Sequence, residues 1–216
     1  MKKIYHFYHV YADGVWQPML DDHIHILKKY NLYENLSFFG VGIVGSKPNI
    51  QLVKTFLEEK NINYNLVFES GDACENQYEQ ETLDQIKEFC QDNEGFVLYT
   101  HTKGAANNFE VHRRWRKSMN YYNVVKWRDA ILHLEENDIT GCHWLTPEKD
   151  GPQVTSPFFG GNFWWARTDY INTLNKPKRN TRWDAEGWIG EGLNIKAYDM
   201  CPGWPSPATF ANEIFY

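Results

Sequence analysis

The sequence predicts a single α/β domain with a mostly parallel central sheet. Along its 216 residues, short runs of β-branched and aromatic residues alternate with amphipathic stretches, which is the pattern typical of βαβ units. The composition, 42% hydrophobic and 23% charged, is that of a folded chain. No Ser/Gly-rich linker and no repeat with a period of about 20 to 50 residues interrupts it. Residues 1–216 are therefore expected to form one domain.

Each expected element follows from its local pattern. Short β-branched and aromatic runs predict strands at 3–10, 37–43, 63–68, 95–100, 139–144 and 162–166. Amphipathic stretches predict helices at 18–30, 49–60, 77–91 and 110–136. In the last helix, apolar residues recur at spacings of three and four and predict one buried face, formed by Val111, Trp115, Met119, Tyr122 and Val125. The segments 146–157 and 201–207 hold three prolines each and are expected to be loops.

Cysteine usage and charge exclude several classes of protein. The four cysteines, Cys74, Cys90, Cys142 and Cys201, include no CxxC pair, which argues against a zinc ribbon and fits free thiols. A net charge of -6 disfavours a nucleic-acid partner, because such binding relies on a basic surface. The first residues lack the apolar run of a signal peptide, and no window approaches the ~20 apolar residues of a membrane span. We expect a cytoplasmic location without a transmembrane segment, and peripheral contact with a membrane stays open.

Ligands of open α/β sheets bind beyond the carboxyl ends of the strands, so the segments that follow strands are the candidate sites. The first strand ends in Tyr8-His9-Val10-Tyr11-Ala12-Asp13-Gly14. This aromatic end is able to stack a flat base, with Asp13 accepting a hydrogen bond from a ribose hydroxyl. The alternative is an ordinary strand and turn, since aromatic residues favour strands. No GxGxxG follows this strand, and GxxxxGK[ST] occurs nowhere in the chain. The segment Gly40-Val41-Gly42-Ile43-Val44-Gly45 resembles the dinucleotide motif only superficially, because no helix is expected to follow directly on its glycines.

The fourth strand leads into His101-Thr102-Lys103-Gly104. Lys103 offers a positive charge for phosphate, Thr102 a hydroxyl, and His101 a ring that binds a metal or donates to a phosphate oxygen. The other histidines lack carboxylate neighbours or an HExxH frame, so only His101 is a candidate metal ligand.

A basic segment follows this motif. Arg113, Arg116 and Lys117 share one helix face by their spacing of three and four. In an acidic chain, a concentrated basic patch close to Lys103 indicates an anionic ligand. The alternative is a solvated helix face, which is how most charge runs are explained.

Two segments near the carboxyl end carry aromatic and acidic residues. In the first, Gly160 and Gly161 permit close approach of a ligand, Asn162 both donates and accepts, and Trp164 and Trp165 offer flat faces suited to sugar rings. A buried strand is the alternative, in which at least one tryptophan belongs to the core. In the second, Asp184 and Glu186 lie among apolar neighbours, where burial raises a carboxylate pKa toward that of a general base. Alternatively, Asp184 caps a short helix and Glu186 lies in its first turn.

Taken in order, these motifs resemble those of small nucleotide-sugar glycosyltransferases of the GT-A fold, similar to domains of polysaccharide-synthesis clusters and of large algal viruses. The resemblance covers nearly the whole chain and depends most on GGNFWWA at 160–166 and AEGWIG at 185–190. It implies a Rossmann-like α/β/α sandwich and transfer from a nucleotide-diphosphate sugar, UDP-sugar above all, to a hydroxyl of a glycan or related acceptor.

The resemblance also implies roles for individual residues. The nucleotide and donor would contact Tyr8, Val10, Tyr11, Asp13, Asp72, His101, Thr102, Lys103, Arg113 and Arg116. The transferred sugar and the acceptor would contact Gly160, Gly161, Asn162, Trp164 and Trp165. Glu186, with Asp184 second, would deprotonate the acceptor in an inverting displacement, whereas a retaining enzyme needs no base at Glu186.

The same resemblance implies Mn²⁺ or Mg²⁺ bound by a DxD motif, but no DxD occurs in the chain. Either His101 substitutes as a metal ligand, or Lys103 with Arg113 and Arg116 neutralises the diphosphate without a metal. Two other classes stay open: a noncatalytic carbohydrate-binding module, which would explain the tryptophans, and a metal-dependent hydrolase built on the histidines with Asp184 or Glu186. Fold alone does not decide among them.

Overall fold

The computed structural model describes residues 2–71, 78–107, 109–147 and 153–203. Its first half alternates strand and helix in the order β1 (Lys3–Tyr11), α1 (Gln17–Lys29), a 3₁₀ turn η1 (Tyr33–Asn35), β2 (Phe38–Val44), α2 (Lys47–Glu59), β3 (Asn65–Ser70), α3 (Gln80–Asp92) and β4 (Gly95–His101). The predicted strands and helices of this half are confirmed, with ends that differ by at most three residues.

The second half is built from shorter elements. It contains α4 (Glu110–Asn120), a π-helical turn η2 (Tyr121–Val125), α5 (Trp127–His133), β5 (Ile139–Gly141), β6 (Trp144–Leu145), β7 (Phe158–Phe159), β8 (Trp164–Arg167), α7 (Thr168–Ile171), α8 (Trp183–Gly187), a 3₁₀ turn η3 (Trp188–Gly190) and β9 (Ala197–Asp199). The sequence pattern did not predict β7, α7 or β9, whereas α8 agrees with the alternative in which Asp184 and Glu186 lie at the start of a short helix.

A seven-stranded sheet in the order β3-β2-β1-β4-β8-β5-β9 is the centre of the molecule. All pairs are parallel except those of β8, which runs antiparallel to both β4 and β5. Strands β6 and β7 form a separate two-stranded ribbon. The predicted α/β/α sandwich with a mostly parallel sheet is confirmed.

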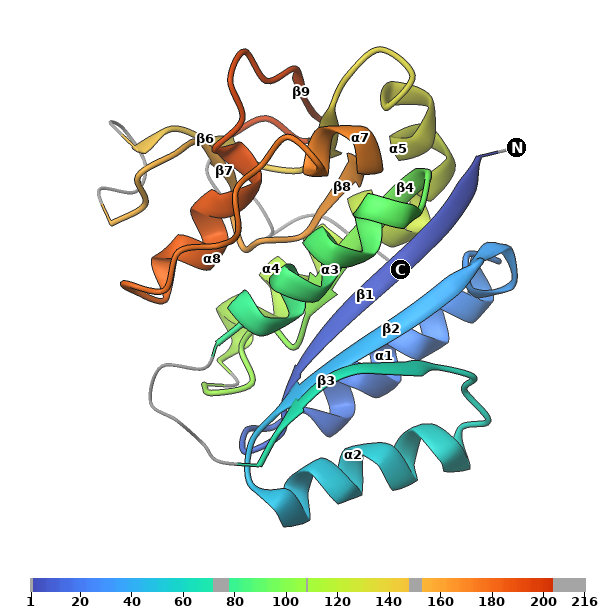
Figure 1. Ribbon diagram of the computed structural model, residues 1–216. Helices are drawn as coiled ribbons and strands as arrows, with labels where there is room; N and C mark the ends of the chain where they lie inside the picture. The colour runs from blue at the N-terminus through green and yellow to red at the C-terminus, as the bar shows by residue number, and fades with distance from the viewer. Residues whose placement is uncertain (1, 72–77, 108, 148–152, 204–216) are drawn as a thin grey trace.

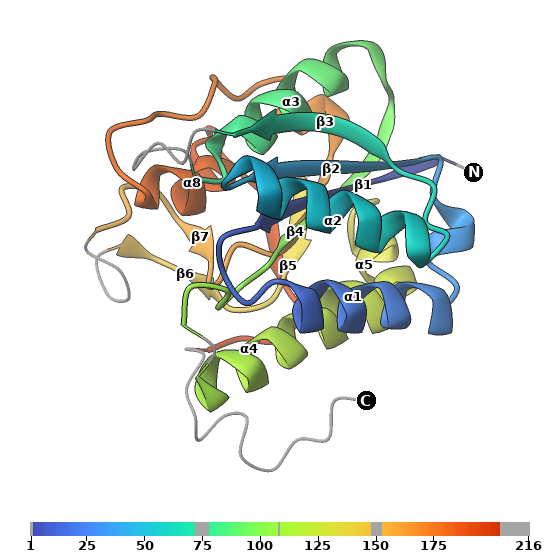
Figure 2. The ribbon, with the colours of Figure 1, turned by 90° about the horizontal axis from the view of Figure 1, so that it is seen from below.

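Helices cover both faces of the sheet, as Figure 2 shows with α3 on one side and α1 and α4 on the other. Alternate residues of β1 explain the two cores: Ile4, Tyr8 and Val10 pack with the apolar faces of α1 and α2, whereas Tyr5 and Phe7 pack with α3. Successive side chains of a strand point to opposite faces, so a strand covered on both faces is buried along most of its length, and in β1 this includes His6 and His9.

The predicted helix 110–136 is wrong in its continuity and in its buried face. The π turn at Tyr121–Val125 separates α4 from α5 and turns Asn123 inward, where its amide donates to the Met119 carbonyl and its own carbonyl accepts from the Trp165 indole. Met119 is buried as expected, but Arg116 is buried as well. The inward surface of α4 is therefore partly polar.

The predicted strand 139–144 is interrupted. His143 has a φ of 63°, and the Asp199 carboxylate accepts hydrogen bonds from the backbone N–H groups of His143 and Trp144. These bonds take the chain out of the central sheet after β5 and start β6 in the ribbon. Similarly, Asn162 has a φ of 60° and lies before β8 instead of inside it.

Candidate functional site

Several loops meet at the carboxyl edge of the parallel strands. Strands β1 and β4 are paired in register up to His9 and His101, so both end at the same level. The loops that follow them touch, because the Val15 N–H donates to the Ala105 carbonyl over 2.8 Å. The first turns of α3 and α4 and the helix α8 lie at this end of the molecule (Figure 1). This is the edge at which open α/β sheets bind ligands.

Glu79, directly before α3, holds the centre of this edge together. One of its carboxylate oxygens accepts a 2.9 Å hydrogen bond from the Tyr99 hydroxyl and a 2.6 Å bond from the Asn162 amide. The other oxygen lies 3.4 Å from Nδ1 of His101. Glu79 thus joins α3, β4 and the loop before β8. No sequence motif surrounds Glu79, so the local pattern does not predict its role.

His101 is buried. Burial, and next the positive charge of Lys103, lower the pKa of His101 to about 3, although the hydrogen bond to Gly161 and the charge of Glu186 oppose this. Its Nε2 donates a 2.9 Å hydrogen bond to the Gly161 carbonyl. His101 therefore fixes the loop before β8 against the end of β4.

The Gly161-Asn162 turn requires left-handed backbone, with φ values of 90° and 60°. A β-carbon on Gly161 would collide with the sulfur of Met119 and lie 3.2 Å from the ring of Trp115. Glycine is therefore needed here for both its conformation and its size. Asn162 tolerates the left-handed region, and its Oδ1 accepts a hydrogen bond from the Trp164 indole.

Lys103 lies at the open side of this cluster. Its ammonium is 3.9 Å from a Glu186 oxygen on α8 and 4.6 Å from the ring centre of Trp115 on α4. The side chains of Lys103 and Glu186 each keep 17% of their surface exposed. The backbone carbonyl of Lys103 accepts a 3.1 Å hydrogen bond from the Arg116 guanidinium. A cation and a carboxylate thus face each other where solvent reaches them.

Four of the predicted contact residues belong to the core. The side chains of Tyr8, Val10, Trp164 and Trp165 are at most 1% exposed, so none of them offers a face to a ligand in this structure. They pack between the sheet and its helices, as the alternative of a buried strand predicted for the tryptophans. The prediction that these four side chains contact the base or the sugar is therefore wrong.

Three other candidates take part in local interactions or lie beside them. Thr102 accepts the Tyr11 N–H through its hydroxyl and ties β1 to β4, and Tyr11 itself is 40% exposed. The Asp13 carboxylate accepts from the backbone and hydroxyl of Ser46 and from Asn49, next to α2. These hydrogen bonds lower the pKa of Asp13, although burial opposes them.

The remaining candidates divide between surface and loop. Arg113 is exposed and paired with Glu110, so the predicted basic face does not exist as one surface with Arg116. Asp184 accepts the N–H groups of Asn180 and Thr181, which is a structural role for its carboxylate. Gly160 is buried and donates to the His143 carbonyl. Asp72 lies outside the described residues.

His101 does not fit the role of a metal ligand proposed for it. Its Nε2 is used by the Gly161 carbonyl, and its Nδ1 faces one carboxylate only. Within residues 2–71, 78–107, 109–147 and 153–203, no three His, Cys, Asp or Glu side chains come together to hold a metal ion. In the same part of the chain, no helix is long and apolar enough to cross a bilayer.

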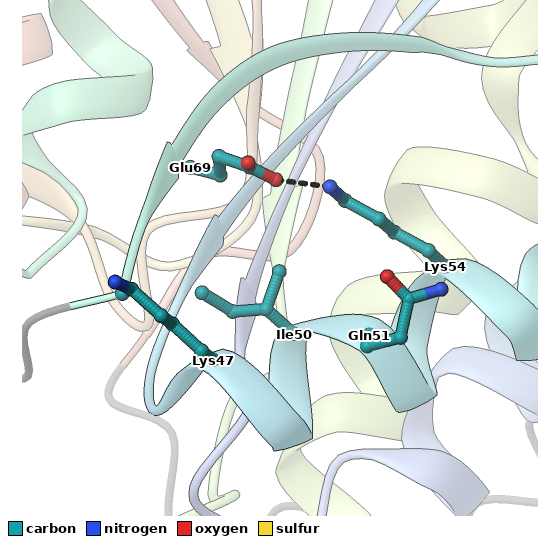
Figure 3. Close-up of a pocket in the computed structure, with 6 residues that line it drawn as sticks. Lys47, Ile50, Gln51, Lys54 and Glu69 are labelled. Atoms are coloured by element: carbon teal, nitrogen blue, oxygen red, sulfur yellow. Dashed lines mark ion pairs between the residues drawn. The ribbon is translucent and has the colours of Figure 1, made fainter.

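A shallow pocket of about 270 Å³ lies elsewhere, between α2 and β3, and is lined by Lys47, Ile50, Gln51, Lys54, Glu69 and Gly71. Figure 3 shows Lys54 reaching from α2 to form an ion pair with Glu69. Strand β3 forms the edge of the sheet and is three strands away from β4. The Lys54 charge is already compensated, so we assign the candidate site to the cluster around Lys103 and Glu186.

Comparison with solved structures identifies the class of fold. The chain is similar to the crystal structure of 4-diphosphocytidyl-2C-methyl-D-erythritol synthase from Anaerococcus prevotii, with a TM-score of 0.55 and 11% sequence identity. The match covers 94% of this chain and 90% of that one. The two proteins share a fold over nearly their whole length.

The sequence also matches the model of a protein family. Residues 17–188 match a family described as a domain of unknown function (DUF8361). The match spans most of the chain, and the protein belongs to this family. No curated protein matches the sequence.

Proposed function

We propose that this protein is a glycosyltransferase that takes a sugar from a nucleotide-diphosphate sugar, a UDP-sugar as first choice, and transfers it to a hydroxyl of a glycan or related acceptor. The observation that carries the proposal is the pair formed by Lys103 and Glu186, 3.9 Å apart and both accessible at the carboxyl edge of β4. One group is a candidate base for a hydroxyl, and the other is a cation for an anionic leaving group. The sequence motifs that resemble this family include both residues.

The proposed reaction is an inverting displacement. Glu186 accepts the proton of the acceptor hydroxyl while that oxygen forms a bond to the anomeric carbon of the donor. The bond from this carbon to the diphosphate breaks, and its electron pair leaves with the diphosphate. Lys103 stabilises the negative charge that develops there. The turn of Gly161 and Asn162 is buried beneath the site, where His101 and Glu79 hold it by hydrogen bonds, and it would support the site without direct contact between the Asn162 side chain and the sugar.

Nucleotidyl transfer is a second candidate, favoured by the similarity of fold to a synthase whose product carries a diphosphocytidyl group. Such a reaction would also need a cation at a phosphate, so Lys103 would serve in both. The two proposals differ in their donors: a nucleotide sugar in one and CTP in the other. They also differ in the small product: glycosyl transfer releases a nucleoside diphosphate, whereas nucleotidyl transfer releases pyrophosphate.

Thermal shift with UDP, GDP, CDP and dTDP, their sugars and CTP tests the proposal. A ligand at 100 times its dissociation constant adds about 2.7 kcal/mol of stability. We expect one nucleoside diphosphate and its sugar to stabilise the protein, and release of that diphosphate on addition of an acceptor. Stabilisation by CTP with release of pyrophosphate would favour the second candidate. Binding of free sugars without any nucleotide would contradict both and favour a carbohydrate-binding module.

A further inference from the structure

Arg116 is a buried cation without an acidic partner. Its side chain is 5% exposed, and no acidic residue in the described part of the chain forms an ion pair with it. One guanidinium nitrogen donates to the Lys103 carbonyl over 3.1 Å, and its Nε has no hydrogen-bond partner there. Buried charges are normally paired, because removing a charge from water is costly. Packing alone therefore does not explain why a charged arginine is buried at this position.

The groups around Arg116 do not supply the missing negative charge. His23 is in electrostatic contact with it, and burial, with a smaller contribution from Arg116, lowers the pKa of His23 to about 3 although Asn120 opposes this. His23 is thus neutral at pH 7. Ser118, two residues along α4, is buried and also uncharged. Among the residues that the structure describes, no acidic side chain pairs with the positive charge of Arg116.

Lys103 adds a second positive charge beside it. The two residues are joined through the Lys103 carbonyl, and the Lys103 ammonium is directed to Trp115 and Glu186. Glu186 is one carboxylate for two cations. Glu79, the other acidic residue of the cluster, already accepts hydrogen bonds from Tyr99 and Asn162. The described part of the site thus holds two cations and two carboxylates, and neither carboxylate forms an ion pair with Arg116.

We infer that Lys103 and Arg116, and not a divalent cation, neutralise the anionic diphosphate of the ligand. Lys103 binds the phosphate oxygens directly. Arg116 is a positioning residue: its hydrogen bond to the Lys103 carbonyl fixes the loop, and its positive charge adds to the attraction for the phosphates. This inference rests on the proposed function, since it concerns the leaving group of the same site. His101 does not fit a metal, because its Nε2 is bound to Gly161.

The test is calorimetry with inorganic pyrophosphate and with UDP, GDP, CDP and dTDP, each in EDTA and in Mn²⁺. Pyrophosphate and at least one nucleoside diphosphate are expected to bind in EDTA, with dissociation constants within about twofold of those in Mn²⁺. Lys103→Met is expected to weaken this binding about tenfold or more, because it removes a charge-assisted contact. Arg114→Gln, an exposed residue of α4 paired with Glu110, serves as the matched control and is expected to bind normally.

Arg116→Met separates the positioning role from a structural one. Replacing an unpaired buried charge by an apolar side chain of similar size leaves the unfolding free energy unchanged or raises it, yet diphosphate affinity is expected to fall severalfold. Arg116→Lys is expected to recover part of the affinity. A destabilised Arg116→Met protein with normal affinity would overturn the role of Arg116.

Different results would overturn the metal-free inference and the proposed function. Diphosphate binding that appears only with Mn²⁺ would overturn the metal-free inference and leave the glycosyltransferase proposal intact. If neither pyrophosphate nor any nucleoside diphosphate binds under either condition, the proposed function itself is wrong, and the inference falls with it.

Discussion

At the scale of the residue, Glu186 is the carboxylate of the described site that is available to accept a proton from an acceptor hydroxyl. Glu79 is held by Tyr99 and Asn162, whereas Glu186 contacts only the Lys103 ammonium at 3.9 Å. Glu186→Gln keeps the shape of the side chain and removes the base. We expect the rate of sugar transfer to fall by about 10² to 10⁴-fold. The affinity for the nucleoside diphosphate should stay the same or rise, since Lys103 loses its acidic neighbour.

The measurement is steady-state kinetics, with calorimetry of diphosphate binding on the same variant. Glu191→Gln is the control, because Glu191 is five residues further along and pairs with Lys178 on the surface. An unchanged transfer rate for Glu186→Gln would exclude the general-base role and point to a mechanism that retains the anomeric configuration. Loss of diphosphate affinity would assign Glu186 to donor binding instead.

Single residues also show where prediction from sequence ends. The sequence predicts His101, Lys103, Asn162 and Glu186, because each follows a strand or lies among aromatic residues. It does not predict Glu79, whose role depends on where α3 begins relative to β4 and to the loop of Asn162. Such convergence comes from tertiary structure, which local patterns do not record.

At the scale of the element, η3 depends on close contact with the segment before β7. A β-carbon on Gly190 would overlap the carbonyl oxygen of Pro157, and backbone atoms move less easily than a flexible side chain. Gly190→Ala is therefore expected to lower the free energy of unfolding by about 1–3 kcal/mol, the usual cost of overpacking. Urea unfolding followed by circular dichroism measures it.

Gly187→Ala in the same region is the matched control. Its new β-carbon would meet a methyl group of Val154 at 2.9 Å, and a side chain can adjust where a carbonyl cannot. We expect a smaller loss of stability, and equal losses in the two variants would contradict the assigned contact. Because η3 continues α8, Gly190→Ala should also reduce activity through the position of Glu186.

The elements were predictable to different degrees for a physical reason. Strands β1, β2 and β4 are buried along most of their length, so burial gives them sequences rich in apolar and aromatic residues that predict a strand. Helix α4 has a mixed pattern because its inward side holds Arg116 as well as Met119. Periodicity assigns charged residues to solvent, and it therefore fails where a charge is buried. The break at His143 depends on hydrogen bonds that the backbone N–H groups of His143 and Trp144 donate to the carboxylate of Asp199, which is distant in sequence.

At the scale of the whole molecule, buried histidines couple stability to pH. Burial lowers the pKa of His9 to about 4 and that of His23 and His101 to about 3, and it lowers the pKa of His6 well below its usual value. In the unfolded chain each titrates near pH 6.5. Between these values the unfolded state binds more protons, so stability is full above about pH 6.5 and is lost as the pH falls toward 4. Each histidine contributes up to about 1.4 kcal/mol per pH unit.

Urea titrations between pH 4.5 and 7.5 should show this dependence of the unfolding free energy on pH. The variant His23→Gln should show a smaller slope, because it lacks the contribution of one histidine. A stability that does not change across this range would mean that these imidazoles are protonated in the folded protein, and that the charge balance around Arg116 is different from the one described.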